Sequence, residues 1–115
     1  MAEPTVPTST VQSLAQEYQQ CLIALEKAIT AMADEHRPAY ELAGCLLRSL
    51  GTGRAIRQIG EGKPDLEWLI AQREVIHQAF GAPGDWGYAT ALGQTLQRLY
   101  ALDLRPFREV AGAPS

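Results

Sequence analysis

The chain has 115 residues, of which 46 % are hydrophobic and 20 % are charged, and its formal net charge is −3. This length supports one hydrophobic core and is too short for two domains. No hydrophobic run approaches the roughly 18 residues that a membrane-spanning helix needs, and the first residues lack the basic and apolar regions of a secretory signal. We therefore expect a cytoplasmic protein that does not bind membranes.

The first long element is predicted at residues 9–34. Residues 1–8 contain two prolines among polar neighbours, and we expect a flexible arm there. Beyond them, hydrophobic residues recur at alternating spacings of three and four, which is typical of one face of a long helix. Gln19 and Gln20 fall opposite this stripe, so we expect both to contribute little to stability. The residues of the stripe are Val11, Leu14, Tyr18, Cys21, Leu25, Ala28 and Met32.

Proline and glycine mark the boundaries of the next elements. Pro38 disfavours helical geometry in the residue before it and suits the first turn of a new helix. A second helix is therefore predicted at residues 38–50, with Gly51 as its C-terminal cap. Four glycines and one proline in residues 51–64 predict a connection around a short helical turn.

Two further helices are predicted in the second half of the chain. Asp65 is a good N-cap for a third helix at residues 65–80, which Gly81 closes. A fourth helix is predicted at residues 85–103, and Pro106 ends it. No alternating run of apolar and polar residues predicts a strand.

These elements predict an all-α fold, a compact four-helix bundle with a short extra helical turn between the second and third helices. Residues 9–110 would form its single helical domain, and residues 111–115 a frayed C-terminus. Both cysteines, Cys21 and Cys45, lie in helical patterns, and we expect them to be buried free thiols.

The third and fourth predicted helices have apolar residues on more than one side. A domain of this size cannot bury both sides of both helices internally, so the spare apolar surface indicates a protein partner, either a second copy or a larger complex. The candidate interface residues are Trp68, Val75, Tyr88 and Leu102.

A basic segment follows the second predicted helix. It holds four cations against the single carboxylate of Glu61, and such a patch can bind phosphate groups. Cations also stabilise the C-terminal end of a helix without any ligand, and we favour that explanation over nucleic-acid binding. The candidate phosphate-contacting residues are Arg48, Arg54, Arg57 and Lys63.

The same segment resembles the small α-helical subunits of CRISPR effector complexes. In one branch of that family, a helix ends in a glycine-containing turn and another apolar helix follows at once. Residues 46–51 (Leu-Leu-Arg-Ser-Leu-Gly) and 55–59 (Ala-Ile-Arg-Gln-Ile) are similar to this arrangement, although the family's asparagine is absent. The resemblance implies contact with nucleic acid and brings no catalytic residue.

His77 allows two other interpretations. With Glu74 it forms a Glu-x-x-His element, but a di-iron bundle needs two copies of that element, so we expect no metal. The segment from His77 to Gly81, with Gly87 ten residues after the histidine, resembles histidine phosphotransfer domains. That resemblance implies phosphorylation of His77, but the family's lysine is missing and Pro83 interrupts a helix that the family keeps continuous.

No motif predicts an enzyme or a bound cofactor. The glycine-containing stretches at 51–54 and 60–63 lack the spacing of a Walker loop. No serine or cysteine has a histidine at a sequence spacing that would indicate an activated nucleophile. The leading expectation is a non-enzymatic helical protein–protein interaction module, either a homo-oligomer or a small subunit of a larger assembly. The first alternative is a nucleic-acid-contacting subunit, and the second is a phosphotransfer domain.

Overall fold

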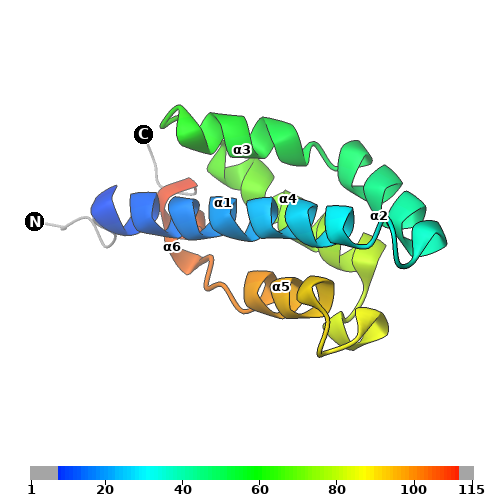
Figure 1. Ribbon diagram of the computed structural model, residues 1–115. Helices are drawn as coiled ribbons and strands as arrows, with labels where there is room; N and C mark the ends of the chain where they lie inside the picture. Colours follow the sequence, from blue (N-terminus) through cyan, green and yellow to red (C-terminus); the bar gives the residue numbers. More distant parts are fainter. Residues whose placement is uncertain (1–7, 112–115) are drawn as a thin grey trace, which may run out of the picture.

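The computed structural model in Figure 1 describes residues 8–111. These residues contain helices and loops but no strand, so the predicted all-α fold is confirmed. They form six α-helices and one 3-10 turn, where four helices and one short turn were predicted. The elements are α1 (Thr8–Ala31), α2 (Arg37–Ser49), α3 (Thr52–Gly60), α4 (Leu66–Phe80), η1 (Pro83–Trp86), α5 (Ala91–Tyr100) and α6 (Arg105–Ala111).

The predicted flexible arm and frayed C-terminus fall on residues 1–8 and 111–115. They lie outside the described residues, except for Thr8, the first residue of α1, and Ala111, the last residue of α6.

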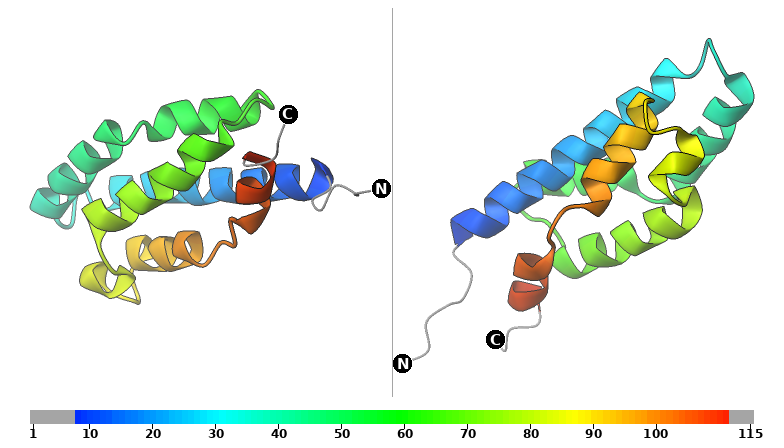
Figure 2. Two further views of the ribbon diagram at one scale, coloured as in Figure 1. Left: turned by 180° about the vertical axis from the view of Figure 1, so that it is seen from behind. Right: turned by 90° about the horizontal axis from the view of Figure 1, so that it is seen from below.

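Helix α1 runs through the middle of the fold, with α3 on one side and α5 on the other (Figure 1). Seen from behind, α4 crosses α1 between these two helices (Figure 2). The predicted apolar stripe faces this core: Tyr18, Cys21 and Leu25 are fully buried, while Val11 and Met32 near its ends are half-buried. The periodicity in the sequence therefore located the central buried face of the molecule.

The connection predicted as a short helical turn is a nine-residue helix, α3. The chain enters it through Gly51, whose φ of 70° lies in the left-handed region that glycine adopts without strain. Ala55 and Ile59 are buried on its inner face, four residues apart as one face of a helix requires. The high glycine content of this segment thus marks the two ends of a helix rather than a flexible link.

The predicted helix at 85–103 is wrong in its extent. Residues 83–86 form η1 instead, Gly87 then takes a φ of 92°, and α5 begins only at Ala91. A Cβ at Gly93 would lie 2.0 Å from the carbonyl oxygen of Gly87, so the turn folds back directly onto the first turn of α5. This close approach between two glycines is a tertiary contact, and hydrophobic periodicity carries no information about it.

Pro106 was expected to end a helix, but it lies in the first turn of α6. Proline is favoured there because the missing N–H has no partner within the helix and the fixed φ suits helical geometry. Phe107, the next residue, is fully buried and packs against Tyr18, with ring centroids 6.4 Å apart. Helix α6 therefore adds a large side chain to the core.

Two buried polar side chains tie the helices together. The Tyr18 hydroxyl donates to the carbonyl of Leu69 at 2.8 Å and lies 3.3 Å from Oε1 of Gln72. The Nε2 atom of Gln72 donates to the carbonyl of Leu50 at 3.0 Å. These bonds join α1 to α4 and α4 to the turn between α2 and α3. Burial raises the pKa of Tyr18, with a smaller opposing effect from the charge of Arg73, so the hydroxyl stays a donor.

Gln19, predicted to lie opposite the buried stripe, makes a contact that the sequence did not predict. It is half-buried, and its Nε2 atom donates to the carbonyl of Ile56 in α3 at 3.0 Å. Gln20 is exposed, as expected for a residue opposite the buried stripe.

Leu25→Ala is expected to lower the free energy of unfolding by about 2–5 kcal/mol, because this leucine is fully buried and its truncation leaves a cavity. Gln20→Ala, in the same helix but on its exposed side, should change that free energy by less than about 0.5 kcal/mol. Urea denaturation of both variants measures the difference. Equal losses would contradict the assignment of the buried face.

Candidate functional site

The four predicted interface residues do not form one surface. Val75 on α4 and Tyr88 in the loop after η1 are 45 % and 65 % exposed, whereas Trp68 and Leu102 are half-buried. Trp68 and Val75 are seven residues apart on α4, so they share one side of that helix. Tyr88 lies in a separate loop and packs on Gly84, where a Cβ would lie 2.8 Å from its ring.

Helix α2 contributes exposed apolar surface that the sequence interpretation missed. Of its thirteen residues only Ala43 is buried, although leucines and a tyrosine line much of the helix. Leu42 is 57 % exposed, and Leu46, Leu47 and Leu50 are half-buried. The sequence shows six hydrophobic residues in the nine positions 42–50, a stripe typical of a helix that packs on a core, but the pattern does not show how much of it a neighbouring helix covers.

Helices α2 and α4 contact each other. Their most exposed large apolar side chains are Leu42 on α2 and Val75 on α4. We call these two residues, together with Trp68, the α2–α4 apolar set.

The two cysteines differ in their surroundings. Cys21 in α1 is fully buried, and burial raises its thiol pKa. Cys45 on α2 was expected to be buried, but it is exposed, and Nη2 of Arg48 lies 3.3 Å from its sulfur. Cys45 therefore belongs to the same incompletely covered helix as Leu42.

The four basic residues of the predicted phosphate patch are all exposed. Within residues 8–111 none of them forms an ion pair with a carboxylate. Arg54 instead places its guanidinium over the ring of Trp68, 5.1 Å from the ring centroid. The structure thus joins one residue from each predicted set, because α3 lies beside the start of α4. Such a cation–π contact contributes about 0.5–1 kcal/mol at an exposed site.

Gly51 completes the surroundings of Trp68. A Cβ at this glycine would lie 3.1 Å from the indole ring. The indole is therefore held between the backbone of the turn after α2 and the guanidinium of Arg54.

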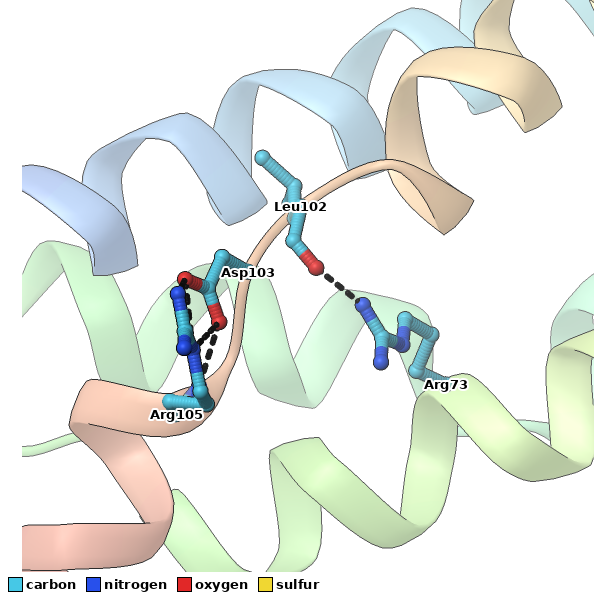
Figure 3. A network of polar contacts seen from close by, with 4 residues as sticks. All are labelled: Arg73, Leu102, Asp103 and Arg105. Carbon is cyan, nitrogen blue, oxygen red and sulfur yellow. Dashed lines mark hydrogen bonds and ion pairs between the residues drawn. The ribbon is translucent and has the colours of Figure 1, made fainter.

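Leu102 belongs to the connection between α5 and α6 (Figure 3). Nη1 of Arg73 in α4 donates to its carbonyl at 2.5 Å, and the Leu102 side chain packs partly against the core. In the next residues, the guanidinium of Arg105 binds the carboxylate of Asp103 at 2.6 and 2.9 Å. Leu102 is thus held through its main-chain carbonyl, and its side chain is only partly available to a partner.

His77 is exposed near the end of α4, with its ring centroid 4.7 Å from that of Tyr100. The helix ends three residues later at Phe80, and Gly81 follows with a φ of 80°. The Tyr100 hydroxyl donates to the carbonyl of Gly81 at 2.8 Å, and burial, with the nearby charge of Asp85, raises its pKa to about 12. Phosphotransfer at His77, the second alternative from the sequence, stays untested.

Across residues 8–111, no three or more His, Cys, Asp or Glu side chains gather as a metal site would require. In the same range, no helix combines the length and the apolar character needed to cross a bilayer. Comparisons with protein family models, with curated proteins and with solved structures found no match to this chain.

The pKa of Asp103 provides a test of the network at the start of α6. Hydrogen bonds from the side chain and the backbone of Arg105 lower this pKa from 3.8 to about 2. Because the folded-state pKa is lowered, the stabilisation is present above pH 3.8 and is lost as the pH falls through about 2. We expect a carboxyl NMR titration to find a pKa near 2 in the native protein, and a value closer to 3.8 in Arg105→Gln. A native pKa near 3.8 would show that the ion pair does not form in solution.

Proposed function

We propose that this chain is a non-enzymatic helical protein–protein interaction module, acting as a homo-oligomer or as a small subunit of a larger assembly. The observation that supports this function best is the poor coverage of α2, where Ala43 alone is buried and Leu42 is 57 % exposed. A helix with this apolar content is ordinarily covered on one side.

The side of α4 that carries Trp68 and Val75 is a second incompletely covered apolar surface. Aromatic side chains are enriched at the centres of protein interfaces, where they bury a large area at a small cost in conformational entropy. Covering a half-exposed leucine or valine contributes about 1 kcal/mol. The α2–α4 apolar set can therefore supply apolar contacts to a protein partner.

The proposal is tested with the variant Leu42→Ser/Val75→Ser and with Val110→Ser as its control. Val110 on α6 is 42 % exposed, close to the 45 % of Val75, so the control removes an apolar area similar to that of Val75 alone from a different helix. For a homo-oligomer, light scattering over a range of concentrations should show a multimer in the native protein and in the control. The dissociation constant of the double variant should be at least about thirtyfold higher, because about 1 kcal/mol is lost at each of the two positions.

For a subunit of a larger assembly, the native protein should be monomeric alone and should retain a specific protein from a native cell extract. The Val110→Ser control should retain the same protein, and the double variant should lose it. The proposed function is excluded if the native protein is a monomer and the control and the double variant retain the same proteins.

Nucleic-acid contact is a second candidate function, favoured by the four exposed basic side chains that have no carboxylate partner within the described part of the chain. Phosphate groups bind such side chains with little rearrangement. Because Arg54 covers Trp68, its removal would also disturb the α2–α4 apolar set, so Arg54 is unsuitable for a clean test.

Arg57→Ala/Lys63→Ala avoids this overlap. If these side chains bind backbone phosphates, the slope of log affinity against log salt should fall by up to about two units, since each lost contact removes about 0.7–0.9. The control Arg98→Ala/Arg108→Ala removes the same charge from α5 and α6 and should leave the slope nearly unchanged. Fluorescence anisotropy with single- and double-stranded oligonucleotides measures both. Absence of binding by the native protein in physiological salt would exclude this candidate.

A further inference from the structure

A cavity of about 670 Å³ lies at one end of the bundle, where the end of α1, the start of α2, η1 and the start of α5 meet. Its volume is within the range of small-molecule sites, which extends from roughly 300 to 1,000 Å³. Most of its wall is apolar, and the residues that matter most for this surface are Ala28, Met32, Ala39, Trp86 and Leu92.

Within residues 8–111, the acidic side chains that line the cavity are not balanced by a lysine or an arginine. Glu35 and Asp85 line it, with His36 and Thr90, and among the residues that the structure describes no lysine or arginine does so. The segments that border it, residues 31–41 and 83–92, contain four carboxylates and one guanidinium. That guanidinium, on Arg37, is paired with Glu41 at 3.2 Å, so little positive charge opposes the two lining carboxylates.

Trp86 gives the cavity a fixed aromatic wall. Its Nε1 atom donates to the carbonyl of Phe80 at 2.7 Å, and its ring lies 5.8 Å from that of Phe80. The indole is therefore positioned before any ligand arrives, which reduces the entropy lost on binding. Tryptophan is also the aromatic side chain that attracts cations most strongly.

The other polar groups of the cavity already make hydrogen bonds within the protein. The Thr90 hydroxyl contacts the carbonyls of Trp86 and Gly87 and accepts from the N–H of Gly93. One carboxylate oxygen of Asp85 accepts from the N–H of Ala82. Glu35 is exposed at the rim, and its carboxylate makes no ion pair in the described structure, so it is the group best able to bind a ligand charge.

We propose that this cavity binds a small organic cation, an amine with an apolar body. The apolar body would lie against the alanines, Met32 and Leu92, and the ammonium group would lie between Glu35 and the indole of Trp86. The inference is independent of the interaction module proposed above, because it rests on a different surface and on the charge of its rim.

The test uses three probes that share a phenylbutyl body and differ in charge: 4-phenylbutylamine, 4-phenylbutanol and 4-phenylbutyrate. Binding is followed by NMR through the indole N–H signals of Trp86 and Trp68, the second of which lies outside the cavity and serves as an internal reference. The amine should shift the Trp86 signal in a saturable manner, with a Kd of about 1 mM, as is typical of a ligand of this size. The alcohol should bind more weakly, and the carboxylate most weakly of the three.

Two variants separate charge from shape. Glu35→Gln should raise the Kd of the amine about two- to fivefold, as expected for one charge pair near a surface, and should leave the Kd of the alcohol unchanged. Glu61→Gln, at the C-cap of α3 and outside the cavity lining, removes the same charge and should change neither value. Ala91→Phe places a ring at an exposed position of the cavity wall and should abolish binding of all three probes.

Several results would overturn the proposal. Equal Kd values for the three probes would show that the carboxylate at the rim does not favour a cationic ligand. Shifts of Trp68 that follow those of Trp86 would show unspecific binding, and no saturation by the amine up to about 10 mM would show that the cavity binds no ligand of this class. An equal effect of the Glu35 and Glu61 variants would exclude a local role for Glu35.

Discussion

Burial of one face of α1 is the interaction on which the other elements depend. Helix α1 has 24 residues, while none of the other helices exceeds the 15 of α4. Short helices are marginal in water and need a packed surface to be stable. Helices α2, α3, α5 and α6 all contact α1, and its fully buried residues Tyr18, Leu22 and Leu25 provide that surface. The fold is thus one long helix around which short helices are arranged.

Helix α4 is attached by polar groups as well as by packing. The Tyr18 hydroxyl donates to the backbone carbonyl of Leu69 in α4, and the Gln72 amide donates to the carbonyl of Leu50 in the turn between α2 and α3. An unpaired polar group in the core would cost about 1–3 kcal/mol, so these bonds specify how α4 crosses α1 rather than adding much net stability.

The parts of the fold that depend on local sequence could be predicted, and those that depend on tertiary contacts could not. The stripe on α1 and the Asp65 cap of α4, whose carboxylate accepts from the N–H of Trp68, follow from periodicity and capping chemistry. The break at Gly87 required knowledge of its contact with Gly93. Pro106 was misinterpreted because a proline can end one helix or begin the next, and the burial of Phe107 decides between them.

The candidate sites show the same division. The exposure of Arg57 and Val75 was expected from their positions in the sequence. The contact between Arg54 and Trp68 could not be predicted, because it requires the path of the chain through Gly51. The cavity beside Trp86 was also missed, since its walls come from two segments, residues 28–39 and 85–92, that are distant from each other in the sequence.

The contact between Gly87 and Gly93 has a consequence for selectivity. Because backbone touches backbone there, η1 and the first turn of α5 form a rigid corner with no side chain that could rotate out of the way. Trp86 and Leu92, on either side of that corner, keep a separation set by main-chain geometry. The main chain would therefore set the width of ligand that fits between these two side chains. Even a methyl group added at Gly93, which does not line the cavity, would change that width.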